Sequence, residues 1–358
     1  MGTKKIKNLL LTGGCGFIGS NFIRYLLEIP DFTGRIINVD KLTYAGNIEN
    51  LSGIGEGYPD RYVFQRADIC DFDLMKDIFS RYNVDAICHF AAESHVDRSI
   101  KRPESFIQTN VIGTFNLLEI ARNHADDFVL FHHISTDEVY GSLGPEGYFT
   151  ETSLYRPNSP YSASKAASDH LVRAYHETYG LPTTISNCSN NYGPYQFPEK
   201  LIPLIIINAV EGKPLPVYGD GKNVRDWLYV RDHCEAIWTV MHAGRRGETY
   251  NIGGNSEMEN IVIVEMICDL LDEILPSSDG YSRRELIAFV KDRPGHDRRY
   301  AIDFSKLHKE LNWTPRESFA SGLRETISWY LNNRQWIDHV RSGDYQAWIA
   351  EQYSEKVR

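Results

Sequence analysis

The sequence lacks an excess of basic residues and any long apolar run. Its 38 Lys and Arg residues are outnumbered by 48 Asp and Glu residues, which gives a formal charge of −10 at pH 7. Proteins that bind nucleic acid broadly usually carry a basic excess, so this class is disfavoured. No apolar stretch reaches the roughly 20 residues that span a membrane. The apolar run at residues 9–11 is too short for a secretory signal. We expect a cytoplasmic protein with neither nucleic acid nor a membrane as partner.

The sequence also has few cysteines, and no two of them form a CxxC pair. Scattered cysteines in apolar runs indicate reduced, packed thiols in a cytoplasmic protein, with zinc ligation as the weaker alternative. We therefore expect no metal site. The six cysteines are Cys15, Cys70, Cys88, Cys188, Cys234 and Cys268.

The composition is that of an ordinary globular protein, with 42% hydrophobic and 24% charged residues. Short apolar runs alternate with helical patterns in the first half. We expect strands at 8–12, 35–40, 62–66, 85–89, 128–135 and 183–187. We expect the intervening helices near 17–28, 71–81, 103–124 and 160–179. Near-continuous apolar strands separated by helices predict an α/β fold with a doubly wound parallel sheet.

The alternation breaks near residue 187, where a loop rich in Asn, Gly, Pro and Tyr begins. Beyond it we expect helices near 198–210, 230–243, 260–275 and 317–332, with one strand near 248–252. This part has few predicted strands and should form a smaller substrate-binding domain. The predicted division is 1–190 for the first domain and 191–358 for the second, with the chain free to cross between them.

A glycine-rich loop follows the first predicted strand. It contains the spacing Gly14-x-Gly16-x-x-Gly19 together with Gly13, and it opens a predicted helix. This context predicts dinucleotide binding, because glycines let backbone N–H groups approach a diphosphate at the helix N-terminus. Asp40 ends the next predicted strand, where a carboxylate can accept both adenosine ribose hydroxyls, which favours NAD over NADP. We therefore expect a Rossmann-type NAD-binding domain.

Tyr161 and Lys165 are spaced i and i+4 on one predicted helix, so both project from one face. A tyrosine with an ordinary pKa near ~10 is a poor base at neutral pH. A nearby ammonium, together with the positive nicotinamide of NAD⁺, favours the phenolate and lowers that pKa. The pair predicts a base that takes a proton from a sugar hydroxyl while hydride leaves for the cofactor.

With these motifs, the chain resembles the extended short-chain dehydrogenase/reductase family that acts on nucleotide sugars. Within that family, Thr136, Asp137 and Glu138 at the end of the fifth predicted strand resemble the Thr-Asp-Glu of dTDP-glucose 4,6-dehydratases. Epimerases of the family generally have a Ser or Thr there without the acid pair. Oxidation at C4 of a hexose acidifies the C5 proton, so elimination needs a base at C5 and an acid at the C6 hydroxyl.

The resemblance implies a role for each of these residues. Asp137 is the acid for the C6 hydroxyl, Glu138 is the C5 base, and Thr136 hydrogen-bonds the C4 oxygen with Tyr161. The expected reaction converts dTDP-glucose to its 4-keto-6-deoxy product and water, with NAD regenerated in each turnover. The catalytic set is Thr136, Asp137, Glu138, Tyr161 and Lys165.

Further segments match the family along nearly the whole chain, and the resemblance implies their contacts. The expected NAD contacts are Gly13, Gly16, Phe17, Ile18, Gly19, Asp40, Lys41, Leu42, Thr43, Asp68, Ile69, Phe90, Ala91, Ala92, Ser94, Thr109, Tyr161, Lys165 and Asn191. The expected substrate contacts are Ser94, Thr136, Asn190, Lys200, Leu201, Pro216, Tyr218, Arg225, Arg231, Asn260, Arg293 and His296. Residues 281–300 also carry a local basic excess, which suits a diphosphate.

Other interpretations remain open at this point. The nearest alternative is a dehydratase for UDP-glucose, followed by another nucleotide-sugar epimerase or a decarboxylase, which the acid pair disfavours. A non-catalytic NAD-binding sensor is the alternative from another class, and the intact catalytic set argues against it. Relatives of the family are commonly homodimers, with the helices near 103–124 and 160–179 at the interface, so we expect a homodimer.

Overall fold

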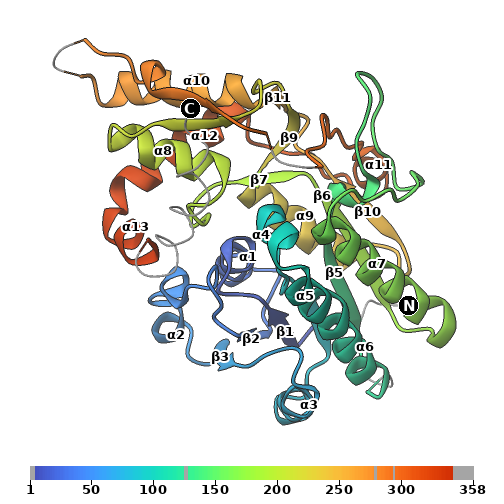
Figure 1. Cartoon of the computed structure of the whole chain (residues 1–358). Coiled ribbons are helices and arrows are strands. Elements are labelled where there is room, and N and C mark those ends of the chain that lie inside the picture. The colour runs from blue at the N-terminus through green and yellow to red at the C-terminus, as the bar shows by residue number, and fades with distance from the viewer. Residues whose placement is uncertain (1–4, 125–127, 278–279, 293–294, 342–358) are drawn as a thin grey trace.

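The protein is built on a seven-stranded sheet in which every neighbouring pair is parallel. The computed structural model describes residues 5–124, 128–277, 280–292 and 295–341. The strand order is β10-β6-β5-β4-β1-β2-β3 (Figure 1). The strands are β1 Asn8–Thr12, β2 Arg35–Asp40, β3 Tyr62–Arg66, β4 Ala86–His89, β5 Leu130–Thr136, β6 Thr183–Cys188 and β10 Thr249–Ile252. The predicted doubly wound parallel fold is confirmed.

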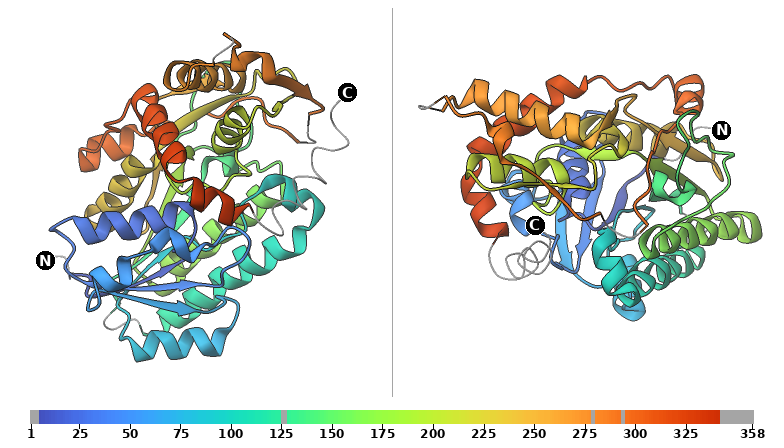
Figure 2. Two further views of the ribbon diagram at one scale, coloured as in Figure 1. Left: turned by 90° about the vertical axis from the view of Figure 1, so that its left-hand side faces the viewer. Right: turned by 45° about the horizontal axis from the view of Figure 1, so that its top comes forward.

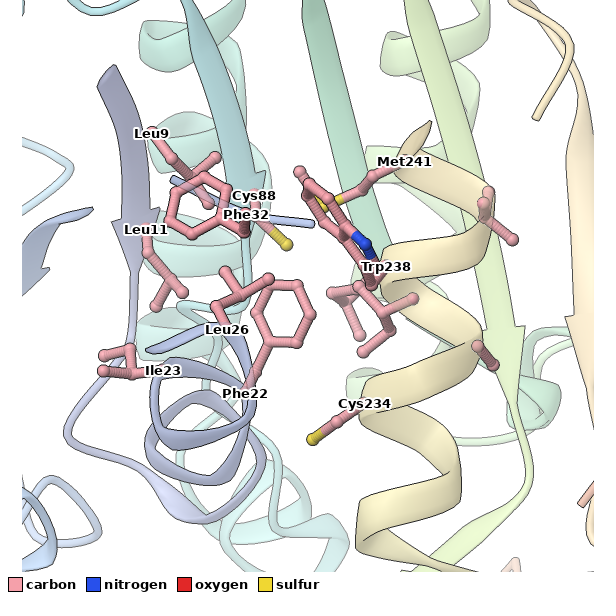
Figure 3. Close-up of a cluster of buried hydrophobic side chains, with 14 of the residues drawn as sticks. Leu9, Leu11, Phe22, Ile23, Leu26, Phe32, Cys88, Cys234, Trp238 and Met241 are labelled. Carbon is pink, nitrogen blue, oxygen red and sulfur yellow. The ribbon is translucent and has the colours of Figure 1, made fainter. Parts of the chain in front are cut away.

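Helices cover both faces of this sheet because successive strand residues point to opposite sides. Leu9 and Leu11 of β1 pack in one cluster with α1 and α9, shown in Figure 3, whereas Leu10 packs in another with α3, α6 and α7. A fully buried side chain of this size contributes about 1.5–3 kcal/mol. The covering helices are α1 Phe17–Glu28, α9 Val230–Ala243, α3 Phe72–Arg81, α6 Thr114–Arg122 and α7 Pro160–Tyr179.

The helix predicted over 103–124 is in fact three joined segments. A short helix, α5 (Pro103–Phe106), leads into a π-helical stretch at Ile107–Gly113, which continues as α6. Asn110 in the π-helical stretch is 1% exposed, and its side chain bonds the backbone of Glu93 and the hydroxyl of Ser164. The widened turn therefore ties the loop after β4 to α7.

The second part of the chain contains more strands than predicted. Five short strands form a three-stranded sheet, β11-β9-β7, and a two-stranded sheet, β12-β8. These strands are β7 Asn190–Tyr192, β8 Leu215–Tyr218, β9 Val224–Tyr229, β11 Glu257–Glu259 and β12 Ile287–Val290. The expectation of few strands here was wrong, because β8 and β12 are only four residues long and β7, β9 and β11 carry polar residues.

Helices α8, α10, α12 and α13 pack around these small sheets on one apolar cluster. In Figure 1 they lie above the large sheet, and the views in Figure 2 show the same layer from two other sides. Both α9 and β10 follow residue 190, yet β10 is a strand of the large sheet and α9 packs against that sheet. The chain therefore crosses back to the first part after the predicted division at residue 190. The remaining helices are α2 Ile54–Gly57, α4 Val96–Lys101, α8 Leu201–Val210, α10 Asn260–Ile274, α11 Ser305–Leu311, α12 Phe319–Asn332 and α13 Arg334–Val340. Short 3₁₀ turns occupy Ile48–Leu51, Asp137–Tyr140 and Arg283–Leu286.

All six cysteines are free thiols, and all except Cys70 are buried. This matches the packed thiols predicted from their scattered positions. Within the described ranges, no helix is both long and apolar enough to cross a bilayer.

Candidate active site

The glycine loop forms a tight cradle between β1 and α1. Gly13 has a φ of +73°, and a Cβ atom there would lie 2.7 Å from the backbone nitrogen of Ala91. A Cβ at Gly19 would lie 2.4 Å from the carbonyl oxygen of Gly13. Neither position accepts a side chain, so backbone lines this surface and the N-terminus of α1 opens onto it. The residues present therefore fit the diphosphate of a dinucleotide.

Asp40, at the end of β2, fixes the adjoining loops. Its carboxylate accepts the N–H of Cys15 at 2.9 Å and the N–H of Leu42 at 2.8 Å. Burial raises the pKa of Asp40, while these two backbone donors oppose the rise. Lys41 forms an ion pair with Asp68 at 2.6 Å. Because Lys41 is engaged by Asp68, it offers less attraction to a 2′-phosphate, and NAD remains favoured over NADP.

A single cavity of about 440 Å³ runs from this loop to the ends of β5 and β6. It contains all five residues predicted to be catalytic and most of those predicted to contact NAD. The predicted residues that line it are Gly13, Gly16, Phe17, Ile18, Gly19, Asp40, Lys41, Thr43, Asp68, Ile69, Phe90, Ala91, Ala92, Ser94, Thr109, Thr136, Asp137, Glu138, Tyr161, Lys165, Asn190, Asn191 and Lys200. Leu42 is the one predicted NAD residue outside this lining, and its side chain packs against the apolar cluster of β1 and α1.

The two acids begin where β5 ends. Glu138 donates its backbone N–H to Thr136 Oγ1 at 3.3 Å, and that hydroxyl donates to Asp137 Oδ1 at 3.4 Å. Asp137 is 2% exposed, and its Oδ2 atom has no hydrogen-bond partner among the described residues. Burial raises the pKa of Asp137 well above its usual range, and the charges of Glu138 and Asp226 raise it further. Asp137 is therefore set up to hold a proton at neutral pH, as a general acid must.

Tyr161 lies in the first turn of α7. Pro160 opens this helix, and Ser159 and Ser162 cap it through reciprocal hydrogen bonds. Burial and the charge of Glu138 raise the pKa of the Tyr161 phenol well above 10. The expected lowering of this pKa is therefore not found in the protein chain by itself, because desolvation of the phenolate outweighs the helix neighbour.

Lys165 is buried one helical turn after Tyr161. Its ammonium donates to the Ile134 carbonyl at 2.7 Å and to His133 Nε2 at 3.2 Å. Burial lowers the pKa of Lys165 to about 8, and the charge of Asp169 opposes that shift. His133 and Asp169 were not predicted as site residues. The only sequence signal for Asp169 was its i+4 spacing from Lys165, and no comparable spacing pointed to His133.

The cavity also contains residues that sequence reasoning missed. Glu199 is 5% exposed and forms an ion pair with Arg98 at 3.2 Å, beside the predicted Lys200. Glu93 lies in the loop after β4, and burial raises its pKa. Its neighbours in the sequence were predicted, and adjacency was the only available signal. The other unpredicted lining residues include Ala45, Gly46, Ser105, Gln108, Ser135, Cys188, Ser189, Gln196 and Phe197.

Six other residues predicted to contact the substrate lie outside the cavity lining, all in the second part of the chain. Tyr218 of β8 stands edge-on to the His296 ring, with the ring centroids 6.1 Å apart. Arg225 of β9 is 5% exposed and stacks on Tyr300, with its guanidinium 4.3 Å from the ring centre. These predicted residues are Leu201, Pro216, Tyr218, Arg225, Asn260 and His296. Asn260, which opens α10, has a buried Oδ1 without a hydrogen-bond partner in the described part of the chain.

Arg231 and Arg293 were also predicted to contact the substrate. Arg231 lies in the first turn of α9, its side chain is 65% exposed, and it pairs with Glu28 of α1 at 3.1 Å. The structure does not bring it to Arg225, because β9 ends at Tyr229 and the turn into α9 directs Arg231 toward α1. The predicted diphosphate contact of Arg231 is therefore not supported. Arg293 lies outside the described residues.

The basic excess predicted over 281–300 is largely neutralised by carboxylates elsewhere in the chain. Four of its arginines form ion pairs with acids outside the segment, so the local charge is smaller than the sequence count suggests. The pairs are Arg283–Asp272, Arg284–Asp269, Arg298–Asp220 and Arg299–Glu257.

Known proteins resemble this chain over most of its length. A sequence model of the GDP-mannose 4,6 dehydratase family matches residues 10–326. The dTDP-glucose 4,6-dehydratase 1 of Escherichia coli K12 is 56% identical over 361 aligned residues, which cover 96% of this chain and 98% of that protein. The chain belongs to the dTDP-glucose 4,6-dehydratase family.

Other members of the dTDP-glucose 4,6-dehydratase family agree in sequence and in structure. The dTDP-glucose 4,6-dehydratase of Xanthomonas campestris pv. campestris B100 is 58% identical over 344 residues, covering 94% of this chain and 97% of that one. The crystal structure of DesIV, the family member from Streptomyces venezuelae with NAD and TYD bound, matches with a TM-score of 0.86. It is 46% identical and covers 93% of this chain and 99% of its own. The predicted family resemblance is confirmed.

Proposed function

We propose that this protein is a dTDP-glucose 4,6-dehydratase that works with NAD. It converts dTDP-glucose to dTDP-4-keto-6-deoxyglucose and water. The observation that carries the proposal is the meeting of Asp137 and Glu138 with Tyr161 and Lys165 in the cavity that begins at the glycine loop. An oxidation site without the two acids would suit an epimerase, and the acids supply what an elimination requires.

The chain's own residues account for the proton movements. Tyr161 takes the proton of the 4-hydroxyl, and Thr136 hydrogen-bonds the C4 oxygen as it becomes a ketone. Glu138 removes the acidified C5 proton, and Asp137, kept protonated by burial, gives its proton to the departing C6 hydroxyl. NAD, when bound, supplies a hydride acceptor for C4 and a donor for C6. Glu138 returns a proton to C5, which completes the product. Tyr161 then releases the 4-hydroxyl proton and Asp137 takes one up by way of solvent, which restores the starting state.

The residues that would hold NAD are those of the cradle and the ends of β2 and β4. Gly13 and Gly19 present backbone to the diphosphate, and Asp40 stands where the adenosine ribose would lie. On the substrate side, Tyr218 offers an aromatic face for a pyrimidine, and Arg225 offers a guanidinium for the diphosphate. The relatives named as dTDP-glucose 4,6-dehydratases support a thymidine rather than a uridine nucleotide.

The decisive experiment offers dTDP-glucose and UDP-glucose separately to the purified protein with NAD. We expect a 4-keto-6-deoxy sugar from dTDP-glucose, without lasting accumulation of reduced cofactor. Turnover of UDP-glucose alone would overturn the nucleotide assignment. A 4-epimer without loss of water would overturn the reaction class.

We also propose that the protein is a homodimer in the cytoplasm. Four large apolar side chains on α4, the π-helical stretch and α6 are at least 40% exposed, which supports an interface there. They are Ile100, Ile107, Ile112 and Phe115. Free thiols at all six cysteines support a reducing compartment. Sedimentation of the protein and of an Ile107→Arg variant tests the dimer: the variant should sediment as a monomer, and a monomeric parent protein would refute it.

A further inference from the structure

A buried chain of polar groups continues from Lys165 away from the cavity. His133 Nε2 lies 3.2 Å from the Lys165 ammonium and 3.3 Å from Asp169 Oδ1. The Asp169 carboxylate accepts a hydrogen bond from Ser135 Oγ at 2.7 Å. It also accepts one from the Tyr155 hydroxyl at 2.9 Å. Lys165, His133 and Asp169 are 4%, 0% and 2% exposed, so water does not screen these charges.

The sequence makes this arrangement possible through the spacing along α7. Tyr161, Lys165 and Asp169 succeed one another at four-residue intervals, so all three lie on the face that packs on β5. β5 contributes His133 and Ser135, whose side chains project to the same side because they are two residues apart. A buried, ionised carboxylate requires a compensating charge, and the Lys165 ammonium is the cation placed to provide it.

We propose that Asp169 and His133 are positioning residues for Lys165. The Asp169 carboxylate supplies the counter-charge that keeps Lys165 an ammonium, and His133 Nε2 accepts a hydrogen bond from this ammonium and fixes its direction. Lys165 in turn favours the phenolate of Tyr161, so Asp169 tunes the base without touching the substrate. This inference rests on the proposed function, in which Tyr161 takes the proton of the 4-hydroxyl.

The directions of the pKa shifts agree with this arrangement. Burial raises the pKa of Asp169 to about 6, and the charge of Lys165 and the bonds from Ser135 and Tyr155 oppose the rise. Asp169 is therefore ionised above pH 6, where it holds the charge on Lys165. Burial and the Lys165 charge keep the pKa of His133 well below its usual value, so His133 remains a neutral acceptor. The other titratable groups that interact with this chain are His89, His132, Tyr140, His170 and Cys188.

The test is the pH profile of dTDP-glucose turnover by the NAD-loaded enzyme, from about pH 6 to pH 9. In Asp169→Asn, the pKa of Lys165 falls because Lys165 loses its counter-charge. The pKa of Tyr161 rises in consequence, because a neutral Lys165 no longer favours the phenolate. We expect the alkaline limb to move down and the acid limb to move up by about one pH unit or more. We expect kcat to fall with little change in KM, because Asp169 does not line the cavity.

Two further variants make the result interpretable. Tyr155→Phe keeps the Asp169 charge and removes one of its two donors, so it should shift the acid limb in the same direction but less. Asp232→Asn is the matched control, because Asp232 is a buried helical carboxylate bonded to the backbone of Arg316 and Glu317. Both limbs of its profile should coincide with those of the parent enzyme.

Each outcome decides for or against the inference. A folded Asp169→Asn enzyme with unshifted limbs would overturn it, as would an equal shift in Asp232→Asn. If Asp169→Asn does not fold, the Tyr155→Phe profile decides, and an unmoved acid limb counts against the inference. If the parent enzyme does not turn over dTDP-glucose, the proposed function fails separately. The near-ultraviolet phenolate absorbance of the NAD-loaded protein, minus that of Tyr161→Phe, then reports whether Asp169→Asn raises the pKa of Tyr161.

Discussion

Replacing Asp137 with Asn separates the oxidation from the elimination. Asparagine matches the carboxyl group in shape but cannot give a proton to the C6 hydroxyl. A positioned general acid typically contributes about a hundred-fold to ten-thousand-fold in rate. We therefore expect Asp137→Asn to lose about 3–5 kcal/mol of transition-state stabilisation in the dehydration step. The oxidation at C4 precedes that step, so reduced cofactor should accumulate on the enzyme after mixing with dTDP-glucose.

The same substitution should stabilise the fold. Asp137 is 2% exposed, and burial raises its pKa well above the usual range. In the unfolded chain it is ionised above about pH 4, so folding at neutral pH requires uptake of a proton. This requirement destabilises the native state as pH rises from the unfolded pKa toward the folded pKa, and asparagine removes it. The melting temperature of Asp137→Asn at pH 7 should therefore exceed that of the parent protein.

The assays are rapid-mixing absorbance of the nicotinamide, product analysis and thermal unfolding. Exchange of the C5 hydrogen in deuterated water distinguishes the two acids: Asp137→Asn should retain the exchange, whereas Glu138→Gln should lose it. Dehydration at the parent rate by Asp137→Asn would refute the assignment of the acid. Loss of C5 exchange in Asp137→Asn with retention in Glu138→Gln would show that the two roles are reversed.

The remaining predictions concern the cradle, the core and the buried histidines. Gly13→Ala should weaken NAD binding at least about ten-fold in calorimetric titration. The reason is that a left-handed alanine costs about 1–2 kcal/mol and its Cβ meets the Ala91 backbone; unchanged affinity would contradict the cradle. Phe22→Ala, at a fully buried position, should lose about 3–5 kcal/mol in urea unfolding, and a loss below about 1 kcal/mol would contradict its place in the core. Burial lowers the pKa of His132 to about 3. Below about pH 6.5 this imidazole is therefore protonated in the unfolded chain but stays neutral in the folded protein. The parent should lose about 2 kcal/mol more stability than His132→Gln between pH 7.5 and pH 5, and equal losses would refute the shift.

The elements that follow simple periodicity were predictable from sequence. Leu9, Leu10 and Leu11 form an uninterrupted apolar run because β1 is central and buried on both faces. β9 was not predicted, because Arg225 and Asp226 lie within it and suggest a polar loop. Asp226 is nevertheless 1% exposed, and it accepts backbone N–H bonds from residues 254 and 256. The partners that make such burial possible come from distant segments, and local pattern carries no sign of them.

The residues of the candidate site were likewise only partly predictable from the sequence. Tyr161, Lys165 and the acids were found because their spacing and their order after β5 carry the chemistry. The direction in which the Tyr161 pKa shifts was not predicted, because the shift depends on burial and on Glu138 rather than on spacing. Arg231 resembles Arg225 in the sequence, but the turn from β9 into α9 separates them. Only the three-dimensional path of the chain distinguishes the two arginines.

The most direct test of the proposed function is one turnover experiment in deuterated water. The NAD-loaded protein is incubated with dTDP-glucose, and the product is analysed for structure and isotope position. The proposed chemistry predicts dTDP-4-keto-6-deoxyglucose with deuterium at C5 and no net formation of reduced cofactor. A dehydrated product without deuterium at C5, or net release of reduced cofactor with each product molecule, would contradict it.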